Sequence, residues 1–185
     1  MKNKKKLVQL IQPYSSLADA ICARVGHRSI AQWFKKLAEC YPQLHTGDLP
    51  KEIKSEYIIH LFDVGMDLTF SHPHAIYADT GDANRWVFRQ VDFFFSPSHK
   101  SAGTAPAPFN LNTETETPES AILKLSDDTT ELNDDLRQSY YLDDGRVVCI
   151  TWRTELAGIK EISVVKLGTD SDFVLPAAIK NKCTE

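Results

Sequence analysis

The residues between Glu114 and Asp144, here called the acidic stretch, are those whose type and spacing most directly suggest an interaction. The stretch holds ten acidic residues against two basic ones, a local charge of −8, whereas the whole chain carries −4. The rest of the chain is therefore net positive. A concentrated negative field attracts basic partners and speeds their arrival. The acidic residues are Glu114, Glu116, Glu119, Asp127, Asp128, Glu131, Asp134, Asp135, Asp143 and Asp144, and the basic ones are Lys124 and Arg137.

Two histidines, His72 and His74, flank Pro73 beside an expected turn. Two imidazoles at this spacing can begin a metal site, but further ligands would have to come from elsewhere in the fold, for example His60 or Asp79. The adjacent aspartate pairs of the acidic stretch lack the alternating oxygen ligands and the glycine of a calcium loop. We therefore expect no metal and no cofactor, and interpret the aspartate pairs as a solvated acidic face or as a contact surface.

The sequence contains none of the local motifs that mark common catalytic sites. It has no GxSxG elbow, no HExxH pair, no Walker loop and no dinucleotide-binding glycine pattern. Cys149 lies between Val148 and Ile150, as expected for a buried packing residue. We expect no enzyme. A hydrolase with a cysteine or His/Asp site assembled from distant residues is kept as an alternative, because such sites are defined by geometry.

Composition and charge limit the class of protein. A chain of 185 residues with 42% hydrophobic content suits one domain, 1–185, with a sizeable core. A pI near 5.9 argues against a dedicated nucleic-acid binder. No run approaches the ~18 apolar residues of a membrane span, and Leu7–Ile11 is too short for a signal peptide. Four scattered cysteines, Cys22, Cys40, Cys149 and Cys183, suggest reduced thiols. We therefore expect a cytoplasmic protein.

The N-terminal part, 14–41, predicts a helical pair. Ser15 or Ser16 can cap a first helix, which Gly26 would end, and Ser29 can cap a second helix with apolar and aromatic residues at helical spacing. Pro42 stops the second helix.

The remaining elements belong to the segment 56–167. Thr117 and Pro118 begin a helix over 118–125, and residues 127–135 are expected to be a loop or a weak helix. Strand patterns do not alternate with helices, so we predict an α+β fold in which the N-terminal helical pair packs with a mainly antiparallel sheet and one further helix. The predicted strands cover 57–62, 66–70, 86–95, 140–142, 146–152 and 159–167, with short additional strand character at 75–77.

Several motifs in this segment carry a family resemblance. Asp63–Phe70 has the form Asp-hydrophobe-Gly-hydrophobe-x-Leu-x-Phe, and Val91–Phe95 forms a later hydrophobic strand. Pro108–Leu111 leads to the helix at Thr117–Leu125, and Tyr140–Leu167 forms a final hairpin. Over about 56–167 the chain resembles small bacterial proteins encoded near polymorphic toxins, including those of contact-dependent growth inhibition. It departs from them at Ser126, where the family has glycine, and in having only half of their G-x-L-P motif.

The resemblance implies an immunity-type protein that neutralises a cognate toxin by stoichiometric binding. If that toxin is a nuclease with a basic, phosphate-gripping cleft, clustered carboxylates would speed the encounter and buried anchors would set the lifetime. The alternative is a chaperone or adaptor for a basic protein. The oligomeric state is left open. The predicted partner-binding residues are Asp127, Asp128, Glu131, Asp134, Asp135, Tyr140, Tyr141, Asp143 and Asp144.

Overall fold

The fold is described from a computed structural model of the chain. For β4, defined below, it describes the backbone alone. The described residues are 16–27, 33, 36, 39, 56–61, 64–71, 87–96, 106–125, 130–134, 136–154 and 158–166.

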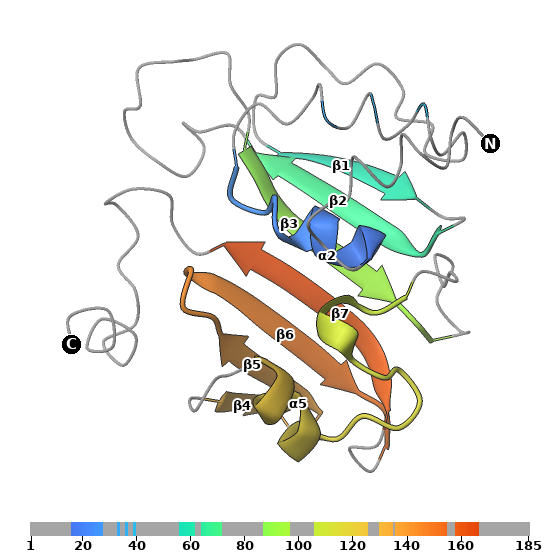
Figure 1. The fold of residues 1–185 in the computed structure, drawn as a ribbon, viewed down its shortest axis with the longest axis vertical. Helices are drawn as coiled ribbons and strands as arrows, with labels where there is room; N and C mark the ends of the chain where they lie inside the picture. The colour runs from blue at the N-terminus through green and yellow to red at the C-terminus, as the bar shows by residue number, and fades with distance from the viewer. Residues whose placement is uncertain are drawn as a thin grey trace.

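The described strands form one seven-stranded sheet in which every neighbouring pair is antiparallel (Figure 1). The order is β1-β2-β3-β7-β6-β5-β4, so the last of the described strands, β7, pairs with β3 at the centre. β1 and β4 are therefore the two edges of the described sheet. The strands are β1 (Glu56–Leu61), β2 (Met66–Ser71), β3 (Val87–Phe94), β4 (Thr130–Asp134), β5 (Arg137–Tyr141), β6 (Arg146–Trp152) and β7 (Ile159–Lys166).

Three helical elements lie on one face of this sheet (Figure 1). They are α2 (Leu17–Cys22), the 3₁₀ turn η2 (Pro108–Asn110) and α5 (Pro118–Leu125). Ser16 caps α2, because its hydroxyl oxygen accepts a hydrogen bond from the backbone N–H of Asp19 at 3.1 Å. No helix in the described part of the chain has the length and apolar character needed to span a membrane.

The hydrophobic core lies between the helices and this face of the sheet. Leu68, Phe93 and Ile150 are fully buried and point to the same side, because side chains alternate along each strand. Ile21 of α2 and Ala121 of α5 are buried against them. Burial of each large apolar side chain contributes about 1.5–3 kcal/mol, which is what holds the short helices on the sheet.

The expected α+β class is confirmed, since an antiparallel sheet carries helices on one face. The prediction of a loop or weak helix for 127–135 is wrong for Thr130–Asp134, which forms β4. Pairing with β5 satisfies the backbone of this polar segment on one side, and that tertiary contact outweighs its low strand propensity.

Two other expectations lie largely or wholly outside the described residues. Of the second helix predicted at 29–41, only Trp33, Lys36 and Glu39 are described, and their backbone is helical. The guanidinium carbon of Arg24 lies 3.9 Å from the centre of the Trp33 ring. The short strand predicted at 75–77 falls outside the described residues.

Candidate functional site

The fold pairs part of the acidic stretch with the protein's own basic residues. Arg153 donates two hydrogen bonds to Glu114, from Nη1 to Oε2 at 2.7 Å and from Nη2 to Oε1 at 2.9 Å. This forked contact lowers the pKa of Glu114 below its ordinary value. The carboxylate is mostly exposed, yet its charge is balanced within the molecule.

Glu116 has a structural role. Its side chain is 1% exposed, and Oε2 accepts hydrogen bonds from Lys124 Nζ and from the backbone N–H of Asn112, both at 2.6 Å. The Ser120 hydroxyl donates to Oε1. Burial alone would raise the pKa of Glu116, but these hydrogen bonds and the charge of Lys124 lower it below its ordinary value. The residue stays ionised inside the fold and is not available to a partner.

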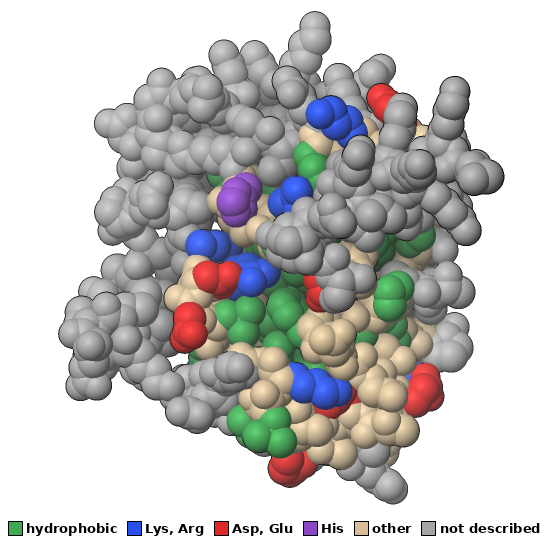
Figure 2. Space-filling model, in the orientation of Figure 1, with side chains coloured by type: hydrophobic (Ala, Val, Ile, Leu, Met, Phe, Trp, Pro, Cys, Tyr) green, Lys and Arg blue, Asp and Glu red, His purple; other side chains and the backbone are tan. Residues whose placement is uncertain are grey.

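Asp144, a predicted partner-binding residue, is also paired internally. Arg146 lies 2.7 Å from its Oδ2 through both Nε and Nη2, and Lys166 Nζ donates to its backbone carbonyl at 2.7 Å. Burial opposes ionisation, yet the hydrogen bonds and charge of Arg146 lower the pKa of Asp144. The neighbouring Asp143 is exposed. Figure 2 shows acidic (red) and basic (blue) side chains next to each other on the helix-bearing face, at the left and at the lower centre of the view.

The five acids of 127–135, here called the acidic segment, include β4. The structure brings Glu131 and Asp134 onto this edge strand, where their backbones pair with Ser139 and Arg137 of β5. Asp127, Asp128 and Asp135 lie outside the described residues. The other side of β4 pairs with no described strand. The backbone of Thr130–Asp134 therefore lies at an edge of the described sheet, where an edge strand can pair with another chain.

The two tyrosines predicted as anchors have different surroundings. Tyr140 is fully buried, and its hydroxyl donates to Gln138 Oε1 at 3.0 Å. Burial, with some effect from Glu119 and Glu116, raises the pKa of Tyr140. Tyr140 therefore belongs to the core and offers no surface to a partner. Tyr141, on the opposite face of the same strand, is half-buried, and Leu136 at the start of β5 is 40% exposed.

The sheet also aligns a row of polar residues that sequence reasoning missed. In the order of the sheet, each strand from β1 to β5 contributes one residue, and directly opposed residues point to the same face. This is the face opposite the core, because the members alternate with core residues along their strands. The signal in the sequence was a polar residue between two apolar ones, as at His60, Asp67 and Asp92, but the register that joins them is set by the fold. The polar row is His60, Asp67, Asp92, Ser163, Cys149 and Ser139, and the backbone of Glu131 on β4 pairs next to Ser139.

Two contacts define the half of the polar row that contains β1 to β3. His60 Nδ1 lies 3.0 Å from Asp67 Oδ1, an ion pair when the imidazole is protonated. Asp92 is 9% exposed and accepts a hydrogen bond from Gln90 Nε2 at 2.7 Å. Burial raises the pKa of Asp92, and the nearby carboxylates Glu161 and Asp67 raise it further, against hydrogen bonds from Ser163 and Gln90.

The polar row does not assemble the hydrolytic site kept as an alternative. Cys149 lies 3.4 Å from Ser139 Oγ, but four strand spacings separate it from His60, on the order of 19 Å. His72 and His74 lie outside the described residues. Within the described ranges, no three His, Cys, Asp or Glu side chains gather in a way that would hold a metal ion.

Comparisons with known proteins add little to this description. No protein-family model matches the sequence, and no curated protein matches it. One solved structure with some likeness is the crystal structure of a DUF4309 family protein, YjgB, from Bacillus subtilis subsp. subtilis str. 168. It has 11% sequence identity and a TM-score of 0.36, over 88% of this chain and 99% of that chain. A likeness at that level carries no argument about function.

Proposed function

We propose that this protein neutralises a cognate bacterial toxin in the cytoplasm by stoichiometric binding, and that the sheet edge at β4 is the contact surface. The observation that carries the proposal is the position of Glu131 and Asp134 on an edge strand of the described sheet. Glu114, Glu116 and Asp144 are paired with the protein's own basic side chains. The acidic segment, 127–135, contains five carboxylates and no basic residue, and part of it forms an edge strand.

The physical chemistry favours a basic partner, such as a nuclease-type toxin domain. Such a domain binds phosphate through lysines and arginines, and these would meet the carboxylates of the acidic segment. The long-range attraction would raise the rate of encounter, whereas desolvated contacts at the centre of the interface would set the lifetime. Tyr141 and Leu136 are the nearby side chains with exposed surface for such contacts. We also propose that 29–41 completes a helical pair with α2.

Charge reversal tests the proposal. We expect substitution of Asp127, Asp128, Glu131, Asp134 and Asp135 by lysine to lower the association rate with the toxin by at least ~10-fold, because electrostatic steering is lost. The toxin would be obtained by co-expression with the product of the neighbouring gene. The rates are measured by surface plasmon resonance, and the melting temperature shows whether the fold is kept.

Matched controls come from the internally paired acids. Glu114→Gln and Asp144→Asn remove charges that already have partners, and they should leave the association rate nearly unchanged. Equal affinity of the five-lysine variant and the parent protein would refute the proposed surface. A partner that keeps its toxic activity in the one-to-one complex would indicate a chaperone or adaptor instead.

A further inference from the structure

The chain between β3 and α5 contains a backbone conformation that is costly for its residues. Phe109 has φ 60° and ψ 26°, and Asn110 has φ 56°, so two consecutive non-glycine residues occupy the left-handed region. Asparagine tolerates this region, but it is unusual for a bulky side chain such as phenylalanine. A strained conformation of this kind persists only where the surrounding contacts impose it. Residues 107–111, here called the η2 segment, must therefore be held in place by neighbouring elements.

Charged side chains from two helices hold the η2 segment. Asp19 Oδ1, on α2, accepts a hydrogen bond from the backbone N–H of Phe109 at 2.7 Å. Lys124 Nζ, on α5, donates to the carbonyl of Asn110 at 2.9 Å and lies 2.6 Å from Glu116 Oε2. Hydrogen bonds to charged groups are stronger than those between neutral groups. The strained backbone is thus fixed between α2 and α5.

The residues that follow the η2 segment are bound to the sheet directly. The backbone carbonyl of Thr113 accepts a hydrogen bond from the N–H of Ile159 at 2.7 Å, and that of Glu116 accepts one from the N–H of Gly158 at 2.9 Å. These bonds join 113–116 to the first residue of β7 and to the residue before it. A movement of the η2 segment can therefore end at Asn112 without disturbing the sheet.

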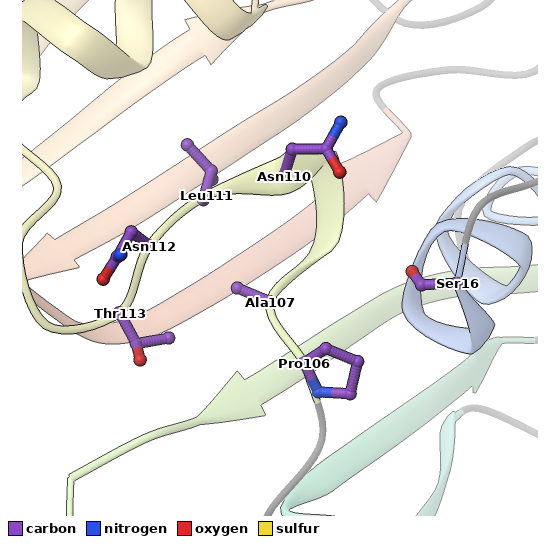
Figure 3. Close-up of a pocket in the computed structure, with 7 residues that line it drawn as sticks. All are labelled: Ser16, Pro106, Ala107, Asn110, Leu111, Asn112 and Thr113. Carbon is purple, nitrogen blue, oxygen red and sulfur yellow. The ribbon is translucent and has the colours of Figure 1, made fainter.

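The η2 segment also borders on open space. Figure 3 shows an open pocket of about 510 Å³ that is lined by Ser16 and by residues of 106–113. On its other side the segment contributes Leu111, which is 6% exposed, to the hydrophobic core. The segment therefore has room to move, and its movement would withdraw Leu111 from the core.

We propose that the η2 segment is a local opening unit, which detaches from α2 and α5 while the sheet stays folded. Opening relieves the strain at Phe109 and Asn110, and this offsets part of the cost of the hydrogen bonds that break. The contacts to Asp19 and to Lys124 break together, because both hold one short stretch of backbone. Segments that move in binding or regulation are drawn from such regions of low opening cost.

This inference is independent of the proposed function. The residues that hold the η2 segment lie outside the acidic segment, 127–135. Failure of one proposal therefore leaves the other standing.

Amide hydrogen exchange of the ¹⁵N-labelled full chain, followed by NMR, tests the proposal. Lys124→Met removes the bond to Asn110 but leaves the bond between Asp19 and Phe109 intact. If the segment opens as one unit, the Phe109 amide should exchange at least ~10-fold faster in this variant, although Lys124 does not contact that amide. Amides at the centre of β6 and β7 should change by less than ~2-fold.

A substitution on α2 tests the same unit from the other side. Asp19→Asn keeps an oxygen acceptor but removes the charge that strengthens the bond to the segment. The Leu111 amide, which donates to the carbonyl of Pro108 at 3.2 Å, should then exchange about 3–10-fold faster. Leu123→Ala, at an 82% exposed position on α5, is the matched control and should exchange like the parent protein.

A double variant guards against global destabilisation. Lys124→Met leaves the carboxylate of Glu116, whose side chain is 1% exposed, without its cation. Glu116→Gln combined with Lys124→Met removes both charges, and the same acceleration at Phe109 is expected.

Three outcomes would overturn the proposal. The first is exchange at Phe109 in the double variant within ~2-fold of the parent protein. The second is equal acceleration at the centre of β6 and β7, which would mean that only global unfolding exposes the segment. The third is unchanged exchange at Leu111 in Asp19→Asn.

Discussion

Gly158 and Gly145 have the same left-handed backbone conformation, but the space for a side chain differs between the two positions. Both have positive φ, 75° and 79°. A Cβ at Gly158 would lie 2.8 Å from the backbone carbonyl oxygen of Glu114 and 3.0 Å from that of Thr113. A Cβ at Gly145 would meet only the flexible end of Lys166, at 3.8 Å.

We therefore expect Gly158→Ala to destabilise the protein more than Gly145→Ala. Gly145→Ala should lower the free energy of unfolding by about 1–2 kcal/mol, the cost of a left-handed alanine. Gly158→Ala should lower it by ~2–4 kcal/mol, because backbone atoms must also move. Urea denaturation of both variants gives the comparison. Similar losses of unfolding free energy in the two variants would mean that the backbone at Glu114 can move aside at little cost.

Single residues also mark the limit of what sequence could predict about the candidate site. Composition identifies the acidic stretch as one charged group, but Glu114 finds its partner Arg153 39 positions away. Glu116 is paired with Lys124, and Asp144 with Arg146. Only the fold decides which carboxylates are paired, so the sequence could not identify Glu114, Glu116 and Asp144 as internally paired acids.

At the scale of elements, strands with a clear pattern were predictable and β4 was not. β6 was predicted within its observed limits, because a run of apolar and β-branched residues follows a strong Asp-Asp-Gly turn signal. β4 reads Thr-Glu-Leu-Asn-Asp, with only one β-branched residue, and it becomes a strand by pairing with β5. Local propensity could not reveal that pairing.

The polar row leads to a prediction about the sheet. Asp92 is buried beside two other carboxylates, Asp67 and Glu161, and its pKa is raised. A raised pKa means that the folded state holds this proton more tightly, so the contribution of Asp92 to stability falls as pH rises above the unfolded value near 3.9. Asp92→Asn keeps an oxygen to accept the hydrogen bond from Gln90 and removes the charge.

We therefore expect Asp92→Asn to raise the free energy of unfolding by about 1 kcal/mol at pH 7. The gain should shrink as the pH approaches 4, where Asp92 in the parent protein becomes protonated. Urea denaturation of the variant and the parent protein between pH 7 and about pH 4 measures this gain in unfolding free energy. A variant that is less stable than the parent at every pH would show that the ionised carboxylate is needed.

At the scale of the whole molecule, the charge distribution is uneven. The chain carries −4 overall, whereas the acidic stretch carries −8. The α+β class could be predicted from the order of helix and strand patterns. The position of β4 at an edge of the described sheet could not, because it depends on the crossover that places β7 between β3 and β6.

This uneven charge predicts a salt dependence for binding at the proposed contact surface. Raising the salt from about 0.05 M to about 0.5 M shortens the Debye length severalfold, so toxin association should slow by at least ~10-fold while dissociation changes little. Association and dissociation kinetics at both salt concentrations measure the effect. A salt-independent association rate would argue against recruitment by the acidic segment.

The seam between β3 and β7 has a consequence for synthesis on the ribosome. Val91 pairs with Val164 and Phe93 with Ile162, so the central hydrogen bonds of the sheet join early and late parts of the chain. During synthesis β1, β2 and β3 are made before β7. The apolar edge of β3 therefore stays unpaired until β7 has left the ribosome. Such long-range closure is slow and leaves the growing polypeptide open to aggregation. We expect cells that overproduce this protein to depend on chaperones that bind the unpaired edge of β3.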